Sequence, residues 1–197
     1  MTPALIAARR SIRRYQDQPL TRQELEAVLE AGRLAPSAKN RQPWRFIVAQ
    51  GAAKAALVEA LRAGLAQEAA RPLLPQSTDC RGRAAQSFSI LDEAPAAIVV
   101  VNPLGRPLDT PLDAEGRVAE LCNAQSLGAA LENMCLTAAA LGLGSLWVCD
   151  TYFAHAALKD WAGIPGEPAA VLALGRPAEA PAPRPRLPLE TITEWRG

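Results

Sequence analysis

A short polar loop between two prolines carries a dense group of hydrogen-bonding side chains. Residues 34–48 read LAPSAKNRQPWRFIV, in which Pro36 and Pro43 enclose Ser37, Lys39, Asn40, Arg41 and Gln42. Because proline lacks an amide proton and restricts the residue before it, this stretch cannot form a regular helix or strand. The apolar residues at 46–48 then predict a buried strand that supports the loop. The pattern indicates either a ligand-binding loop or a solvated connection between a helix and a strand.

Arginines gather near both ends of the chain. They are Arg9, Arg10, Arg13 and Arg14 at one end, and Arg184 and Arg186 in a proline-rich stretch at the other. A guanidinium group is a planar fork that suits a phosphate, and alternate side chains of an extended segment point the same way. We therefore expect a small anionic ligand. The alternative is a nucleic-acid-binding or solvated basic patch, but no aromatic platform or larger basic surface accompanies these arginines.

The remaining composition argues against several other kinds of chemistry. The formal net charge is +1, which gives no general attraction to nucleic acid or membrane. The four cysteines form no C-x-x-C pair and His155 is the only histidine, so neither a metal site nor a Ser/His or Cys/His nucleophile is indicated. No acid–base pair is visible. We find no signal peptide or membrane-spanning run, and we expect reduced cysteines and a cytoplasmic location.

The hydrophobic pattern predicts an α+β fold in one domain, residues 1–197. Thr2 and Pro3 are expected to begin a short helix, and Thr21 with Glu24 forms a capping box before a helix that Gly32 ends. Further helices are expected at 52–65 and near 151–162, and strands at 46–49, 96–101, 145–149 and 169–174. The strand at 96–101 is apolar throughout, which predicts burial on both faces.

Three other segments have distinct patterns. Residues 66–93 lack periodicity and are expected to be an irregular excursion. The longest helix, about 119–141, is apolar nearly all round, so it must be covered inside the fold or at a subunit interface. The stretch 177–197 is expected to be an extended tail because its first half is rich in proline and alanine.

Four motifs, in order along nearly the whole chain, together resemble the FMN-dependent nitroreductase family. They are P-S-x-x-N-x-Q-P-W at Pro36–Trp44, R-x-S-x-R with a following aromatic at Arg9–Tyr15, A-x-x-L-G-L-G at Ala138–Gly144, and the basic pair Arg184 and Arg186 before Leu187-Pro188. The resemblance implies a small mixed, mainly antiparallel sheet surrounded by helices. It also implies a homodimer with the long apolar helix at the interface.

The resemblance assigns FMN contacts to three groups of residues. The phosphate and ribityl chain would be held by Arg9, Arg10, Ser11, Arg13, Arg184 and Arg186. The partner subunit would supply Pro36, Ser37, Ala38 and Asn40. The isoalloxazine ring would meet Ser126, Trp147, Cys149 and Asp150. Ala38 departs from the hydroxyl residue often found at its position, and Cys149-Asp150 departs from the glycine common in that turn.

The resemblance implies an enzyme whose chemistry is carried by the flavin, with no catalytic side chain. NADH or NADPH would pass a hydride to FMN, and a nitroaromatic, quinone or similar small-molecule acceptor would then take the electrons in a ping-pong reaction. The alternatives are a flavin-fragmenting or dehalogenating relative, a non-catalytic flavin-binding or redox-sensing module, and a basic-patch nucleic-acid binder. A yellow protein that bleaches with reduced nicotinamide separates an enzyme from the last two.

Overall fold

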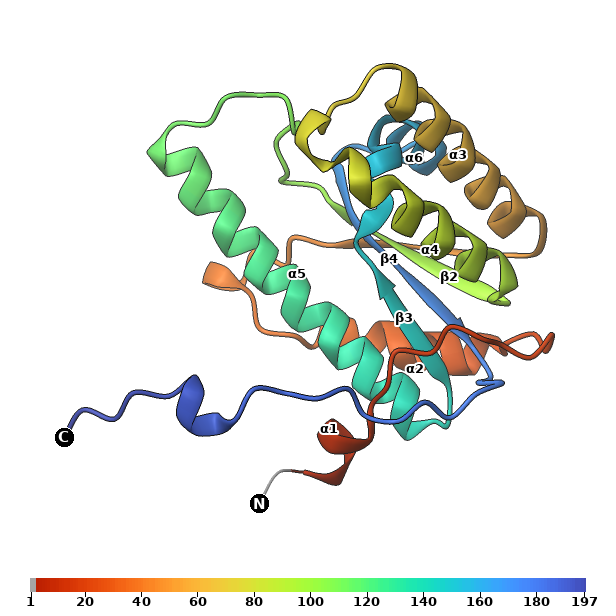
Figure 1. Ribbon diagram of the computed structural model, residues 1–197, viewed down its shortest axis with the longest axis vertical. Coiled ribbons are helices and arrows are strands. Elements are labelled where there is room, and N and C mark those ends of the chain that lie inside the picture. The colour runs from red at the N-terminus through yellow and green to blue at the C-terminus, as the bar shows by residue number, and fades with distance from the viewer. Residues whose placement is uncertain (1–2) are drawn as a thin grey trace.

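A four-stranded antiparallel sheet lies between two groups of helices (Figure 1). The computed structural model describes residues 3–197, so the expected capping residue Thr2 lies outside the described residues. The strands are β1 (Arg45–Gln50), β2 (Ala96–Asn102), β3 (Gly144–Val148) and β4 (Glu167–Gly175), in the order β1-β2-β4-β3. The predicted α+β class with a mainly antiparallel sheet is confirmed.

Strand β2 is the centre of the core, and every one of its residues is buried. Because successive side chains of a strand point to opposite faces, its apolar run supplies both hydrophobic layers. Val99 packs in the layer covered by α3 (Gly51–Ala70), α4 (Arg81–Glu93) and α6 (His155–Ala162). Val100 packs in the opposite layer, covered by α2 (Arg22–Arg33) and α5 (Ala114–Ala140). The predicted burial of this strand on both faces is therefore confirmed.

Helix α2 begins as its sequence predicts. The Thr21 hydroxyl accepts a hydrogen bond from the Glu24 amide, and the Glu24 carboxylate accepts one from the Thr21 amide, which completes the capping box. Two amides that have no partner within the helix are satisfied in this way.

The predicted irregular excursion at 66–93 is wrong in extent. Helix α3 continues to Ala70 and α4 occupies Arg81–Glu93, so only residues 71–80 are irregular, with a 3₁₀ turn, η2, at Pro75–Cys80. The Glu68 carboxylate accepts hydrogen bonds from the amides of Leu73 and Leu74 at 2.9 and 2.8 Å and holds this turn. The alanines, serines and glycine of the two helices weaken the apolar periodicity that would have revealed them.

The predicted long apolar helix is also corrected. Helix α5 begins at Ala114, earlier than expected, with the Asp113 side chain capping the Gly116 amide. Its first turns expose charged residues as well as Val118 and Leu121, and only its later part is buried along one side. Alanine occurs on every face of this helix, so the sequence pattern indicates no polar side even where the helix is exposed. Among residues 3–197, no helix is both long and apolar enough to cross a membrane.

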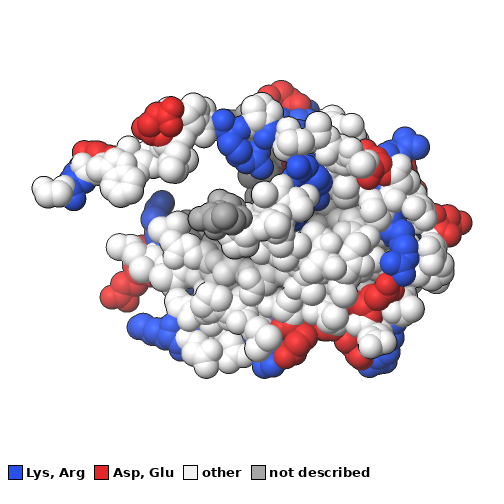
Figure 2. All heavy atoms as spheres, turned by 90° about the horizontal axis from the view of Figure 1, so that it is seen from below, with Lys and Arg blue, Asp and Glu red and all other residues white. Residues whose placement is uncertain are grey.

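The two ends of the chain are held beside each other at the β3 edge of the sheet. After α1 (Ala4–Ala8), the Ile12 amide donates to the Ser145 carbonyl of β3 at 2.9 Å. The Gln16 amide then donates to the Arg176 carbonyl, and the Ala178 amide to the Arg14 carbonyl, both at 2.9 Å. Beyond residue 178 the chain is extended except for a 3₁₀ turn, η4, at Leu189–Thr191, and it projects away from the body (Figures 1 and 2).

Replacing Gly144 by alanine is expected to destabilise the fold by pushing away the segment that carries the N-terminal arginines. A Cβ atom at Gly144 would lie 2.8–2.9 Å from three side-chain atoms of Ile12, which is itself buried. Overpacking of this kind costs about 1–3 kcal/mol of unfolding free energy. Urea unfolding monitored by circular dichroism measures the change.

Gly82→Ala is the matched control, because a Cβ atom there meets nothing within 4 Å. Gly82 lies in α4, where alanine is favoured over glycine by up to about 1 kcal/mol. The two substitutions should therefore change the stability in opposite directions. A Gly144→Ala protein as stable as Gly82→Ala would contradict the close packing of Ile12 against β3.

Candidate functional site

The two chain ends enclose a cavity of about 320 Å³ that is lined mainly by arginine and proline. We call it the arginine cavity. Its lining residues are Ile6, Ala7, Arg9, Arg10, Ser11, Arg13, Pro181, Ala182, Pro183, Arg184 and Arg186. The structure thus brings together all six residues that the resemblance assigned to the FMN phosphate and ribityl chain, although more than 170 positions separate the two groups in the chain; Arg14 lies outside the cavity. Figure 2 views the face on which the tail leaves the body.

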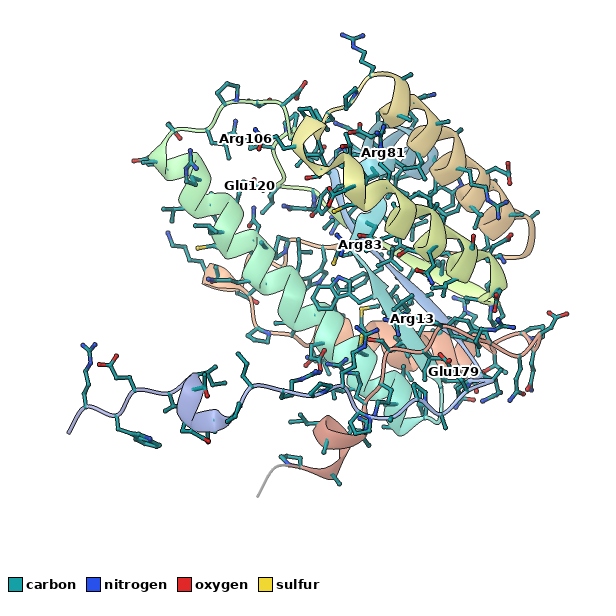
Figure 3. All side chains as sticks on the ribbon, in the orientation of Figure 1. Arg13, Arg81, Arg83, Arg106, Glu120 and Glu179 are labelled. Atoms are coloured by element: carbon teal, nitrogen blue, oxygen red, sulfur yellow. The ribbon has the colours of Figure 1, made fainter. Side chains whose placement is uncertain are left out.

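Local contacts set the positions of the N-terminal arginines. The Arg10 Nη1 atom donates to the carbonyls of Ala7 and Arg9 at 2.6 and 2.9 Å, so this side chain closes the end of α1. The Arg9 Nε atom lies 3.4 Å from Glu132 Oε1 of α5, yet it is buried without a hydrogen bond among the described residues. The Arg13 amide donates to the Glu179 carboxylate, and Figure 3 shows these two residues close together.

Five guanidinium groups around so small a volume make the arginine cavity strongly positive. The carboxylates of Glu132, 3.4 Å from Arg9 Nε, and of Glu179, which accepts from the Arg13 amide, offset part of this charge but not all of it. Like charges held together destabilise the compact state, whereas an anion between them would gain several charge-assisted hydrogen bonds. The donor set is therefore that of a phosphate or a similar anion.

A second cavity, of about 230 Å³, lies where β3 ends. We call it the strand-end cavity; its lining includes Trp147, Cys149, Tyr152, His155 and Glu167, together with Gly128 of α5. Ser145, Trp147 and Cys149 alternate along one chain segment and share a face. Because Ser11 forms a parallel bridge with Ser145, the strand leads from the arginine cavity toward this second one. The Trp147 Nε1 atom is buried and has no hydrogen-bond partner within residues 3–197.

Cys149 does not have the surroundings of a reactive thiol. Burial raises the pKa of the Cys149 thiol, and the neighbouring Asp150 carboxylate raises it further. The thiol therefore stays protonated at neutral pH and is a poor nucleophile. Asp150 starts the 3₁₀ turn η3 (Asp150–Ala154) and accepts a hydrogen bond from Ser87 Oγ at 2.7 Å.

The polar loop is held in an unusual conformation. The 3₁₀ turn η1 (Ala38–Asn40) contains Lys39 and Asn40 with φ angles of 53° and 52°, and Gln42 has 49°. Non-glycine residues adopt this left-handed region rarely, and a surrounding structure must hold them there. The Gln42 amide donates to Ser37 Oγ at 3.0 Å, so the loop is closed by one of its own predicted ligand-binding residues.

Ser126 supports the loop from α5. Its hydroxyl accepts a hydrogen bond from the Ala38 amide at 3.2 Å and donates one to the Cys122 carbonyl at 2.7 Å. The side chain is buried, and both bonds are made within one protomer. In this structure Ser126 therefore fixes the position of the loop, a contact that its sequence pattern did not reveal.

The predicted site residues do not all meet within one chain. Ala38 lines a third and larger cavity of about 880 Å³, together with Lys39, Arg41, Arg106 and the first turns of α5. Pro36, Ser37 and Asn40 line neither the arginine cavity nor the strand-end cavity. A site that uses every predicted residue would need the polar loop of a second copy.

The structure also reveals a buried acid–base pair that sequence reasoning missed. The His155 Nε2 atom lies 3.4 Å from Glu167 Oε2, and Lys159 Nζ donates to Glu167 Oε1 at 2.6 Å. Burial lowers the pKa of His155, and this effect exceeds the opposing influence of the Glu167 carboxylate. No local pattern signals the pair, because a helix and a turn separate the two residues in the chain.

Comparisons of the sequence and of the structure with known proteins all indicate the same family. The sequence profile of the nitroreductase family matches residues 6–176. An NADH dehydrogenase of Thermus thermophilus is 34% identical over 201 residues, covering 95% of this chain and 92% of that protein. The crystal structure of a protein from Desulfovibrio desulfuricans, described as a nitroreductase in complex with FMN, is 28% identical. The superposition of the two structures covers 98% of this chain and 95% of that protein, with a TM-score of 0.72.

Proposed function

The chain belongs to the nitroreductase family, and from this premise we propose that two copies bind FMN between them and pass electrons from NADH or NADPH to a nitroaromatic, quinone or similar acceptor. As a member of this family it is an NAD(P)H-dependent oxidoreductase that uses FMN. The observation that carries the proposal is the arginine cavity, where both ends of the chain supply phosphate-binding groups.

The FMN phosphate would lie in the arginine cavity. Arg9, Arg13, Arg184 and Arg186 line the cavity and offer the donors, although the Arg9 Nε atom already lies 3.4 Å from the Glu132 carboxylate. Arg10 would contribute indirectly, because its hydrogen bonds to the carbonyls of Ala7 and Arg9 hold the segment that carries Arg9 and Arg13. The residues present therefore fit a phosphate monoester.

The rest of FMN would follow β3. From Ser145 to Cys149 the chain covers about 13 Å at the usual rise of a strand, which suits the ribityl chain and the ring together. Trp147 would pack against the ring, and Cys149 and Asp150 would offer backbone amides where the strand ends. When bound, FMN accepts a hydride and returns electrons, while the protein supplies binding, orientation and electrostatics.

A second copy would complete the site. The polar loop does not line the strand-end cavity of its own chain, so a partner's loop would close it. Two apolar surfaces support this assembly. Val118 and Leu121 are 60% and 57% exposed on α5, and the projecting tail exposes Leu187, Leu189, Ile192 and Trp195 (Figure 1). Large apolar side chains that are exposed next to one another indicate an interaction surface.

The nicotinamide donor would enter by the cavity of about 880 Å³ that Ala38 lines. Asp113 and Glu115 also line this cavity, but the cations Lys39, Arg41 and Arg106 suit the phosphates of NADH or NADPH. Figure 3 shows Arg106 on the loop across from Glu120 of α5. Because Ala38 belongs to the same cavity and to the polar loop, the donor would approach the flavin at the boundary between the two copies.

The phosphate assignment predicts a difference between FMN and riboflavin. Replacing Arg13 or Arg186 by alanine should remove charge-assisted hydrogen bonds worth roughly 1.5–3 kcal/mol. FMN binding should therefore weaken by about one to two orders of magnitude. Riboflavin lacks the phosphate, so the wild type and both variants should bind it almost equally. Fluorescence titration of the apoprotein with each ligand measures both affinities.

Arg14→Ala serves as the control for charge, because Arg14 is 69% exposed, pairs with Glu93 at 3.3 Å and lies outside the arginine cavity. Its FMN affinity should stay within about twofold of the wild type. If riboflavin affinity falls as far as FMN affinity in folded Arg13 or Arg186 variants, these arginines do not hold the phosphate.

The shared site predicts that assembly and FMN binding are lost together. Replacing both Val118 and Leu121 by glutamate puts unpaired charges on an apolar surface and should yield a monomer with greatly reduced FMN content. Light scattering with simultaneous absorbance detection measures both properties, and Gln23→Glu on the exposed first turn of α2 provides the control. A monomer that retains FMN would refute the shared site.

A further inference from the structure

The single histidine of the chain lies in a wall between two cavities. His155 begins α6 and Glu167 begins β4, and their side chains are only 10% and 11% exposed. Both residues line the strand-end cavity. Both also line a neighbouring cavity of about 480 Å³, which we call the α6 cavity and which reaches α3 and the loop at 107–109. The pair therefore borders both cavities, which also share Leu108 and Tyr152.

The facing atoms of this pair are left without hydrogen bonds. His155 Nε2 and Glu167 Oε2 are both buried without a partner within residues 3–197, although only 3.4 Å separates them. Buried polar atoms are satisfied in most native structures, and an exception indicates strain, a catalytic role, or a water or ion as its partner. A small rotation of either side chain would form a hydrogen bond between His155 Nε2 and Glu167 Oε2. The two side chains can therefore make or break this bond with little movement.

Burial keeps the imidazole neutral by lowering the pKa of His155; among the surrounding charges, Glu167 and Asp109 raise this pKa and Lys159 lowers it. Lys159 Nζ holds Glu167 Oε1 at 2.6 Å, and the Lys159 side chain is 42% exposed, so the pair is connected to solvent. Tyr152 stacks on the imidazole with ring centroids 6.2 Å apart. The other charged groups near the two cavities are Asp109, Arg106, Glu120, Glu68 and Arg71.

The chemistry proposed above needs a proton that the nicotinamide donor does not supply. Reducing a quinone to a hydroquinone takes two electrons and two protons, whereas NADH or NADPH gives a hydride, which carries two electrons and one proton. The remaining proton must come from water. Tyr152, His155 and Glu167 are titratable and line both the strand-end cavity and the α6 cavity. Burial raises the pKa of Tyr152, so it holds its proton, whereas His155 and Glu167 lead to the partly exposed Lys159.

We propose that His155 delivers this proton to the acceptor and that Glu167 positions and stabilises the imidazolium; this inference rests on the proposed function. A proton enters from the α6 cavity and binds the neutral imidazole beside the Glu167 carboxylate. The imidazolium N–H bond then breaks as an O–H bond forms on the reduced acceptor in the strand-end cavity. The imidazole returns to its neutral form, and the electron pair of the new O–H bond comes from the acceptor.

The test compares two acceptors in the FMN-loaded enzyme. A benzoquinone needs protons, whereas ferricyanide takes electrons without any. In His155→Gln, the kcat for benzoquinone should fall roughly 10- to 100-fold, toward the lower end of what general acids contribute. The kcat for ferricyanide and the rate of flavin bleaching by NADPH should stay within about twofold, because neither step uses the acid.

Glu167→Gln gives a second and independent readout. The carboxylate raises the pKa of His155 and Lys159 lowers it, so removing the carboxylate should lower the pKa of His155 further. The kcat for benzoquinone falls as rising pH deprotonates His155, and in Glu167→Gln this fall should occur at lower pH than in the wild type. The kcat for ferricyanide should not change. Asp160→Asn, an exposed position on the same helix, should leave both profiles unchanged.

Two outcomes are separable. If wild-type enzyme reduces neither acceptor with NADH or NADPH, the proposed function fails and the proton relay fails with it. If the wild type reduces both, but folded His155→Gln loses turnover equally for both acceptors or for neither, the relay alone is overturned.

Discussion

Three backbone hydrogen bonds between distant segments determine the site. The amides of Ile12, Gln16 and Ala178 join the N-terminal segment to β3 and to the chain after β4. Each bond contributes only about 0.5–1.5 kcal/mol net, but together they fix the register of two segments that have no regular structure of their own. This register brings Arg13 and Arg186 to the lining of one cavity, the arginine cavity. The same contacts place Ser11 beside Ser145, where β3 leads toward the strand-end cavity.

Strand β3 connects the arginine cavity, where we propose that the phosphate binds, with the strand-end cavity, where we propose that the chemistry occurs. Its buried partner β4 begins at Glu167, and the turn after β3 leads directly into the helix of His155. The sheet therefore holds the arginine cavity, Trp147 and the His155–Glu167 pair on one rigid support. The polar loop is supported separately, through the hydrogen bond from the Ala38 amide to the Ser126 hydroxyl of α5.

Much of this architecture could be predicted because its signals are local. The capping box at Thr21, the apolar run of β2 and the paired arginines each follow from a few neighbouring residues. The meeting of Arg13 and Arg186 was expected only from a resemblance and from the need for a common anion. The extents of α3 and α4 were missed because alanine and serine give no clear periodicity. The His155–Glu167 pair and the Ser126–Ala38 bond depend on tertiary contacts, which a single sequence does not encode in any local pattern.

The most direct test of the central claim is the anaerobic absorbance spectrum of the FMN-loaded protein during titration with NADH or NADPH. If this chain holds FMN along β3 and exchanges electrons through it, the visible band of the flavin should disappear on adding one or both nucleotides. The band should return when a quinone is added. A protein that binds no flavin, or whose bound flavin is bleached by neither nucleotide, would contradict the account.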